Sequence, residues 1–362
     1  MDAGRTVEGV RRIAAVRANG IGDYCFAVPA LDSLRAAYPQ AEIVLLGKRW
    51  HAEFLAGRPG PIDRVVVVPP YGGVSADPGT PEDATALERF FRAMQAERFD
   101  LALQLHGGGR YSNPFTRRLQ ARVTAGMRTP DAEPLDRFIP YVYFQPEVLR
   151  YLEVVALVGA PPHVVEPAIT VTARDRAEVE RIGLERDAGF AVIHPGATDP
   201  RRRWPVEKFA AAGQALARAG LRVVVIGTGE ERRLVHAVAA KIVPPALEIC
   251  DRVSLGGLAA LLARSRVVVS NDSGPLHLAA AVGAATVGIY WCGNLINGGP
   301  MTRRWHRPSI SWRLECPVCG RNTLYDNCEH RVSFVADVPV EEVTAFALAL
   351  ARDRAAERSI AA

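Results

Sequence analysis

Short apolar runs alternate along the first half of the chain with segments of helical periodicity. The runs that predict buried strands are residues 11–18, 41–47, 64–69 and 100–106. Residues 24–38 predict a helix, which ends at Pro39 because proline lacks the amide that a further turn needs. Strands that are apolar on both faces are typical of parallel sheets covered by helices, so this half predicts an α/β domain.

The same alternation restarts after a proline-rich segment at residues 159–171, which predicts a linker. The strands predicted beyond it are residues 190–196, 221–227, 266–272 and 285–291, with helices at 206–219 and 230–240. The second half therefore predicts another α/β domain of the same kind.

We therefore expect two Rossmann-like, doubly wound domains that face a cleft. The N-terminal domain is expected over residues 1–163, the C-terminal domain over 164–340, and a final helix over 341–362. A chain of 362 residues is long enough to bury two cores of ordinary size. Ligands of such sheets bind beyond the carboxyl ends of the strands, so that is where we expect the functional residues.

Composition narrows the classes of protein. The sequence has no uninterrupted run of about 18 apolar residues, and its N-terminus lacks the apolar core of a secretion signal, so we expect a cytoplasmic protein. The net charge of +5 is spread along the chain, which argues against a dedicated nucleic-acid binder. A small anionic ligand, or transient contact with the anionic inner membrane surface, is compatible with this charge.

The first candidate motif is Asn-Gly-Ile-Gly-Asp at residues 19–23, between a predicted strand and a predicted helix. Gly20 and Gly22 allow a tight turn and close backbone approach. Asp23 then lies near the helix N-terminus, where a carboxylate can act as a general base toward a hydroxyl. The alternative is that Asp23 only caps the first turn of the helix.

Two further motifs follow predicted strands of the second half. His-Pro-Gly-Ala-Thr at 194–198, with three arginines and Trp204-Pro205 after it, can bind a phosphate through Arg, or can be a solvated basic loop on which Trp204 packs. Gly-Thr-Gly-Glu-Glu at 227–231 can hydrogen-bond ribose hydroxyls, or can only stabilise the dipole of the next helix.

The most informative stretch is Ser-Asn-Asp-Ser-Gly-Pro-Leu-His-Leu-Ala-Ala-Ala at residues 270–281. A strand ends in polar residues, and a helix of small residues follows that can aim its N-terminal amides at an anion. Asp272, Ser273 and His277 are expected to line that opening. The alternatives are a helix cap for Asp272 and a hydrogen-bonded core histidine for His277.

The cysteine motif near the C-terminus predicts a metal site. Cys316, Cys319, Cys328 and His330 have the spacing of a tetrahedral zinc or iron knuckle, with Cys292 as an alternative ligand to His330. Four protein ligands leave no open position, so the metal would be structural. The competing interpretations are a set of reduced thiols in an irregular loop and a redox switch.

In order and spacing, these motifs resemble glycosyltransferase family 9, the ADP-heptose:lipopolysaccharide heptosyltransferases, over about residues 12–290. The resemblance implies a GT-B fold, inversion at the anomeric carbon, no catalytic metal, and Asp23 in the position of the catalytic base. The donor-binding residues that the motifs and the resemblance indicate are Gly22, Thr198, Arg202, Gly227, Glu230, Glu231, Asp272, Ser273, Gly274 and His277.

The chain departs from the family pattern at two places. The basic position, commonly Lys, is Arg202 within an arginine triplet, and the cysteine knuckle at 316–330 is not a feature of the best-known lipopolysaccharide enzymes. Some family members that glycosylate proteins carry a cysteine-ligated metal finger near this place. The predicted function is therefore transfer of a sugar, heptose by resemblance, from a nucleotide-diphosphate donor to a cell-surface glycan, lipid-linked or protein acceptor.

Two other functions remain open at this point. A nucleotide-sugar epimerase on the same fold would convert the donor without any acceptor. A non-catalytic nucleotide-sugar-binding protein would bind the donor, and replacement of Asp23 would have no catalytic consequence.

Overall fold

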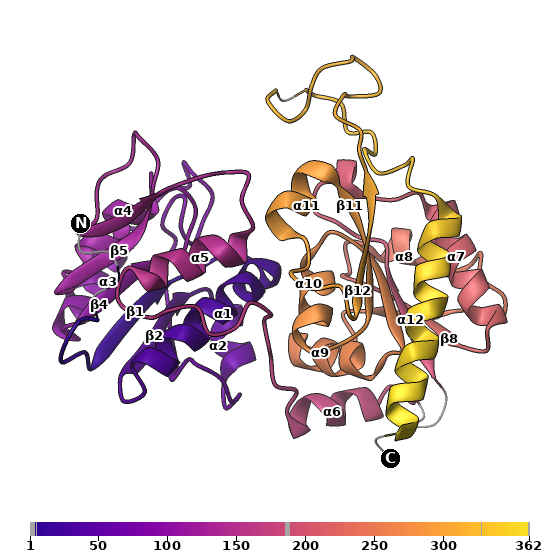
Figure 1. The fold of residues 1–362 in the computed structure, drawn as a ribbon, viewed down its shortest axis with the longest axis horizontal. Coiled ribbons are helices and arrows are strands. Elements are labelled where there is room, and N and C mark those ends of the chain that lie inside the picture. The colour runs from indigo at the N-terminus through magenta and orange to yellow at the C-terminus, as the bar shows by residue number, and fades with distance from the viewer. Residues whose placement is uncertain (1–3, 5, 185–188, 327, 361–362) are drawn as a thin grey trace. The chain divides into compact units, whose positions relative to one another are not determined.

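The computed structural model describes residues 4, 6–184, 189–326 and 328–360. The chain divides into two compact units, Met1–Thr170 and Val171–Ala362. The division falls inside the proline-rich segment 159–171, which also contains the boundary expected after residue 163. Each unit is built on one sheet covered by helices (Figure 1).

The N-terminal unit contains a parallel sheet of six described strands in the order β3-β2-β1-β4-β5-β6. The strands are β1 (Arg12–Val16), β2 (Glu42–Gly47), β3 (Arg64–Val67), β4 (Leu101–Gln104), β5 (Val123–Arg128) and β6 (Arg137–Pro140). The helices are α1 (Ile21–Ala37), α2 (Arg49–Leu55), α3 (Ala84–Ala96), α4 (Ser112–Arg118) and α5 (Glu147–Ala156). Phe91 of α3 and Phe115 of α4 pack on one face of the sheet, while α5 contacts α1, β4, β5 and β6.

The C-terminal unit repeats this plan with the order β12-β11-β10-β7-β8-β9. Its described strands are β7 (Phe190–His194), β8 (Arg222–Gly227), β9 (Leu247–Cys250), β10 (Val267–Asn271), β11 (Thr286–Trp291) and β12 (His306–Ser311). Its helices are α6 (Ala173–Glu180), the 3₁₀ turn η1 (Pro200–Arg202), α7 (Val206–Arg218), α8 (Arg232–Ala239), α9 (Leu255–Arg264), α10 (Gly274–Ala281), α11 (Cys292–Gly298) and α12 (Val340–Ile360).

Helix α12 belongs to the C-terminal core. Its Val343, Ala347 and Leu350 are buried in the same apolar cluster as Phe209 of α7 and Ile193 of β7. Figure 1 shows α12 beside α7 on one face of the sheet, with α9 and α10 on the other. The segment expected as a separate terminal helix therefore completes one layer of this domain.

The eight predicted strands and the predicted helices are present, so the α/β fold is confirmed. Strands β5, β6, β9 and β12 were not predicted. Of these, β9 is only Leu-Glu-Ile-Cys, and β12 carries Pro308, which an edge strand tolerates because it need not donate to a second neighbour. No helix of the described residues has both the length and the apolar character that crossing a membrane requires.

Trp204 packs in the C-terminal core, as one interpretation of its motif predicted. The side chain is 1% exposed and its ring meets Phe209 edge to face at 5.1 Å. Its indole Nε1 donates to the Val338 carbonyl at 3.0 Å, and its amide donates to Asn271 Oδ1 at 2.9 Å. Trp204 therefore joins the segment before α7, the segment before α12 and the end of β10.

We predict that Trp204→Ala destabilises the C-terminal unit by about 3–5 kcal/mol, because it leaves a cavity where a large buried side chain was. Trp312→Ala is the matched control, since Trp312 is 70% exposed, and should change the free energy of unfolding by less than about 0.5 kcal/mol. Urea unfolding followed by circular dichroism measures both. Equal losses in the two variants would contradict the packing role of Trp204.

Candidate functional site

The strand order places the candidate residues of the C-terminal unit together. Strand β7 lies between β8 and β10, so the connections after β7 and β10 leave the sheet in opposite directions. The motif at residues 194–198 begins at the last residue of β7, and Asp272–Gly274 follow β10 at the same edge of the sheet. A crevice at such a switch point is the usual ligand site of a doubly wound sheet.

Asp272 is a buried carboxylate that three side chains hold. It is 4% exposed, and its Oδ1 lies 3.0 Å from His277 Nε2. Its Oδ2 accepts from Asn294 Nδ2 at 2.8 Å and lies 3.3 Å from Arg202 Nη1. Burial alone would raise the pKa of Asp272, but His277, Arg202 and Asn294 lower it overall. Asp272 therefore stays ionised and fixes the orientation of His277 and Arg202.

The three consecutive arginines have different partners. Arg201 forms a forked ion pair with Asp199, at 2.6 Å for its closest contact. Arg203 donates to the Ala197 carbonyl at 2.9 Å. Arg202 reaches across to Asp272 from η1. Of the triplet, Arg202 is therefore the cation that lies beside the N-terminus of α10.

His194 connects the loops after β7, β8 and β10. Its ring is buried, with Nδ1 at 3.1 Å from Ser273 Oγ and Nε2 at 3.5 Å from Glu231 Oε2. Glu231 also accepts from the Thr228 amide at 3.0 Å. The His194 hydrogen bond is the main cause that lowers the pKa of Glu231 to about 2. Glu231 is therefore an anionic hydrogen-bond acceptor at neutral pH.

Gly196 is required for this arrangement. A Cβ at this position would lie 1.9 Å from Glu231 Oε1, much closer than two unbonded atoms can approach. The close approach explains a glycine between β7 and the basic loop. Gly227, at the end of β8, is similarly constrained, since a Cβ there would lie 2.7 Å from Val235 Cγ2.

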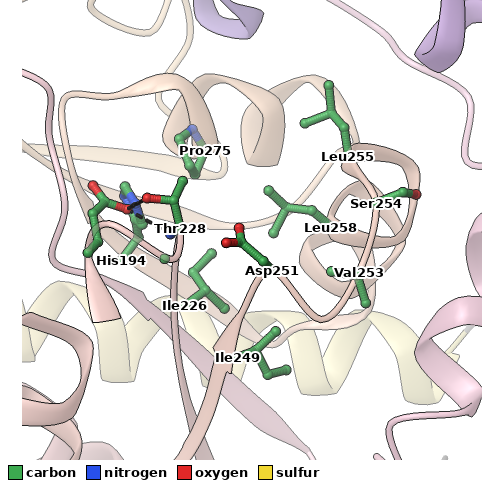
Figure 2. A pocket seen from close by; sticks show the side chains of 12 residues that line it. His194, Ile226, Thr228, Ile249, Asp251, Val253, Ser254, Leu255, Leu258 and Pro275 are labelled. Atoms are coloured by element: carbon green, nitrogen blue, oxygen red, sulfur yellow. Dashed lines mark hydrogen bonds and ion pairs between the residues drawn. The ribbon is translucent and has the colours of Figure 1, made fainter. Parts of the chain in front are cut away.

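A pocket of about 180 Å³ opens beside Glu231 (Figure 2). Its lining is polar at Glu231, Thr228 and Asp251, and apolar at the isoleucine and leucine side chains. The lining residues are His194, Ile226, Gly227, Thr228, Glu231, Ile249, Asp251, Val253, Ser254, Leu255, Leu258 and Pro275. Such a lining suits a flat, largely apolar group with hydroxyls at one end.

Asp251 was missed by the sequence analysis, because it follows the unpredicted strand β9. Its φ is +51°, an uncommon value for a residue other than glycine, and its Oδ2 accepts from the Gly229 amide at 2.6 Å. Asn294, in α11, was missed for a different reason, since its contact with Asp272 depends on tertiary structure alone. Two signals in the sequence could have indicated Asp251, namely the short apolar run before it and the helix cap at Ser254.

Other predicted donor-site residues lie as follows. Glu230 is exposed, whereas Glu231 lines the pocket. Thr198 is exposed in the loop after β7. Ser273 and Gly274 form the start of α10, and Ser273 Oγ donates to the Asn271 carbonyl at 3.1 Å.

Asp23 and Gly22 lie in the first turn of α1 in the N-terminal unit. Asp23 Oδ2 accepts from the Gly20 amide at 3.0 Å, so this carboxylate does cap the helix. Its Oδ1 accepts from Arg17 Nη2 at 3.1 Å. The side chain is still 38% exposed, so the cap leaves it accessible to a hydroxyl.

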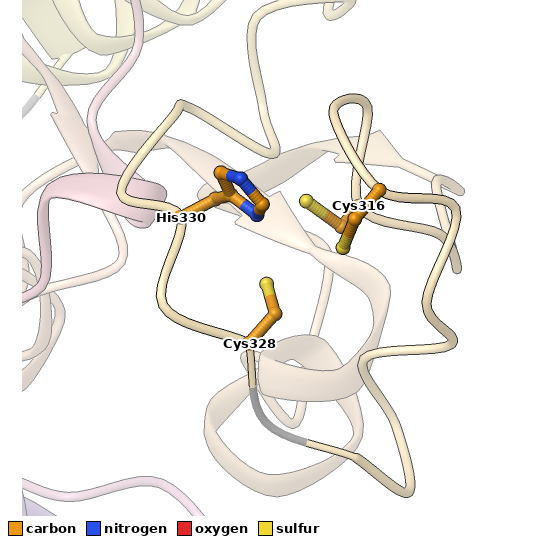
Figure 3. A group of neighbouring side chains, drawn as sticks. Cys316, Cys328 and His330 are labelled. Atoms are coloured by element: carbon orange, nitrogen blue, oxygen red, sulfur yellow. The ribbon is translucent and has the colours of Figure 1, made fainter.

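Cys316, Cys319, Cys328 and His330 come together in the loop between β12 and α12 (Figure 3). Their candidate ligand atoms all lie within 4.8 Å of one another. Gly320, at φ +68°, closes the turn by donating to the Cys316 carbonyl at 2.9 Å. His330 Nδ1 is buried without a hydrogen-bond partner among the described residues, as a metal ligand would be. Cys292 begins α11 and is not part of this group.

Two parallel six-stranded sheets, with candidate residues at the carboxyl ends of their central strands, define a two-domain α/β protein with the GT-B fold. Residues 87–311 match the family model described as glycosyltransferase family 9 (heptosyltransferase). The chain belongs to this family and is a glycosyltransferase.

Individual relatives are distant but cover most of the chain. The lipopolysaccharide core heptosyltransferase OpsX of Haemophilus influenzae is 19% identical over 304 residues, covering 81% of this chain and 82% of that protein. The structure of Escherichia coli ADP-heptose lipopolysaccharide heptosyltransferase II has a TM-score of 0.72 at 18% identity, covering 95% and 99%. The iron-containing dodecameric glycosyltransferase TibC of enterotoxigenic E. coli H10407 has a TM-score of 0.57 at 12% identity, covering 96% and 80%.

Proposed function

We propose that this glycosyltransferase moves heptose from ADP-heptose to an acceptor hydroxyl with inversion at the anomeric carbon. The observation that carries the proposal is the pocket beside Glu231, which adjoins the N-terminus of α10. The matched family, with the ADP-heptose enzyme among the similar structures, supports heptose and adenine as the donor's parts.

The donor fits the C-terminal unit group by group. The apolar wall of Ile226, Ile249 and Leu258 suits a nucleobase, and ionised Glu231 suits the ribose hydroxyls as an acceptor. The diphosphate would then lie toward the N-terminus of α10, where the helix dipole and Arg202 are favourable to negative charge. Arg202 would exchange part of its contact with Asp272 for phosphate oxygens.

Asp23 is the proposed general base. The acceptor oxygen forms a bond to the anomeric carbon while its proton passes to the Asp23 carboxylate and the bond to the ADP oxygen breaks. A single displacement of this kind inverts the anomeric configuration. The charge that develops on ADP is stabilised by Arg202 and by the amides of the α10 N-terminus. The reaction requires the base of one unit to reach the sugar held by the other.

The acceptor class is a cell-surface glycan, lipid-linked or protein. Lipopolysaccharide is the acceptor that the names of the similar enzymes indicate. The similar structure of TibC is described as iron-containing, and the cysteine cluster of this chain has ligands that iron accepts. Val142, Tyr143 and Phe144 are exposed after β6 in the N-terminal unit, and suit transient contact with the inner membrane surface by a cytoplasmic enzyme.

The donor prediction is tested by calorimetric titration with ADP-heptose, ADP and UDP-glucose. ADP-heptose and ADP should bind, and UDP-glucose should bind at least about tenfold more weakly. Gly196→Ala should weaken ADP binding by about tenfold or more, because the new Cβ displaces Glu231. Gly60→Ala, where the Cβ would have no neighbour within 4 Å, is the control. Preference for a uridine or guanosine donor would rule out ADP-heptose.

The base assignment predicts that Asp23→Asn lowers the turnover number by about a hundredfold or more and leaves ADP affinity nearly unchanged. Asp32→Asn, the same change further along α1, should retain most of the activity. ADP release with and without a heptose-deficient lipopolysaccharide acceptor measures transfer. Full turnover in Asp23→Asn would show that another group takes the proton. Conversion of ADP-heptose into a different ADP-sugar, without acceptor, would indicate an epimerase.

We also propose that the cluster at residues 316–330 holds one structural zinc or iron ion. Three thiolates and one imidazole are ligands that both metals accept, and together they fill a tetrahedral site. Bound metal would join the turn at Cys316–Gly320 to Cys328 and His330 and so order the loop between β12 and α12. Four protein ligands would leave no open coordination position on the ion, so it would take no step in transfer.

This proposal predicts about one zinc or iron ion per chain in protein purified without added metal, measured by mass spectrometry. Cys316→Ser should lose the ion. Cys292→Ser should keep it, because Cys292 is a buried cysteine outside the cluster. Visible thiolate absorbance would identify iron. Metal-free, folded wild-type protein would favour reduced thiols.

A further inference from the structure

Arg17, the residue directly after β1, is a buried cation that the proposed reaction does not itself use. It is 1% exposed, although arginine is rarely buried without a specific partner. Its Nε donates to the Asp23 carbonyl at 3.0 Å and its Nη1 donates to the Leu105 carbonyl at 2.9 Å. These two main-chain contacts fix the plane of the guanidinium between the first turn of α1 and the end of β4.

The remaining nitrogen of Arg17 is shared by two carboxylates. Nη2 donates to Asp23 Oδ1 at 3.1 Å and to Glu147 Oε2 at 3.0 Å. Glu147 is the first residue of α5, and its Oε2 also accepts from the Tyr151 hydroxyl. One positive charge thus lies between two negative charges, and only one of the two belongs to the proposed base.

We propose that Arg17 and Glu147 are positioning residues that set the orientation and the basicity of Asp23. The inference rests on the proposed function of Asp23 as general base. Arg17 holds Oδ1 while the Gly20 amide holds Oδ2, so the carboxylate has one orientation. A guanidinium alone would make Asp23 a poor proton acceptor, and Glu147 offsets this effect by sharing the same nitrogen.

The charged side chains around Arg17, Asp23 and Glu147 can each be named. Burial would lower the pKa of Arg17, but the Asp23 and Glu147 carboxylates beside it raise that pKa above its ordinary value. Arg150 is a second cation, 3.9 Å from Glu147 Oε1. Among the described groups that face Arg17 and Asp23, the acids are therefore Asp23 and Glu147.

The neighbouring histidines, Cys25 and Tyr151 stay neutral over the working pH range. Burial lowers the pKa of His51 and of His106 to about 3, and Lys48 adds a charge to their surroundings. Burial also raises the pKa of Cys25 and that of Tyr151, so both keep their protons. A change in the titration of Asp23 can thus be assigned to Glu147.

The test is Glu147→Gln, which removes the charge but keeps an oxygen that can accept from Arg17 and Tyr151. Glu153→Gln is the matched control, because Glu153 is an exposed residue of the same helix that bonds Gln145. The first measurement is a ¹³C NMR titration of the Asp23 carboxyl carbon in the full chain, assigned by its loss in Asp23→Asn. Glu147→Gln should move its midpoint about one pH unit lower, and Glu153→Gln should leave it in place.

A second variant gives a shift of opposite sign. Tyr151→Phe removes the hydroxyl that donates to Glu147. Glu147 should then bind Arg17 more strongly, and the bond between Arg17 and Asp23 should weaken. The Asp23 midpoint should therefore rise by a fraction of a unit. A purely structural role for Glu147 does not produce opposite shifts from these two changes.

The second measurement is the pH profile of heptose transfer. In Glu147→Gln the acidic limb should move to lower pH with the NMR midpoint, and the turnover number should fall about three- to tenfold at an unchanged KM for the donor. An Asp23 midpoint equal to that of Glu153→Gln would overturn the inference. If the wild-type chain transfers no heptose, the proposed function fails, while the NMR titration still decides the roles of Arg17 and Glu147.

Discussion

The burial of both faces of a parallel sheet determines where this protein can carry chemistry. Helices cover both sides, as α3 and α4 do on one face of the first sheet, so polar groups are confined to the edges where the strands end. In both units the order reverses beside the first strand, at β1 and β4 and again at β7 and β10. The connections after these strands carry Asp23 in one unit and Asp272 in the other.

A second constraint is that the functional groups are held by each other. Asp272 is bonded by His277, Asn294 and Arg202, and Asp23 by Arg17 and the Gly20 amide. Buried charges of this kind add little net stability, because the desolvation of each ion opposes their attraction. What they supply is fixed orientation, which catalysis by preorganised dipoles requires.

The sequence was sufficient for those parts of the fold and site that depend on local pattern. Long apolar strands such as 221–227 and 266–272 could be predicted, because a strand buried on both faces has consecutive apolar residues. Motifs beside them, such as 270–281, lie at strand ends for the same reason. The alternative that Trp204 packs was confirmed, because its side chain is buried against Phe209.

Residues whose role depends on distant contacts could not be found in this way. Nothing in the spacing of Arg201, Arg202 and Arg203 tells which one faces Asp272; Asp199 and the Ala197 carbonyl decide it by binding the other two. Asn294 and Glu147 lie in helices far along the chain from the carboxylate or cation they serve. Asp251 follows a strand too short to be recognised by its pattern.

Each unit pairs a buried charge with a partly exposed charge of opposite sign, and the signs are reversed between the two units. In the C-terminal unit an anion, Asp272, is buried and orients the cation Arg202, which is 30% exposed. In the N-terminal unit a cation, Arg17, is buried and orients the anion Asp23, which is 38% exposed and accessible to a hydroxyl. In both, the inner charge is enclosed by the fold and the outer one faces solvent. In the proposed mechanism, this division would let Arg202 and Asp23 change partners during transfer and keep their orientation, because the inner charge has further bonds of its own.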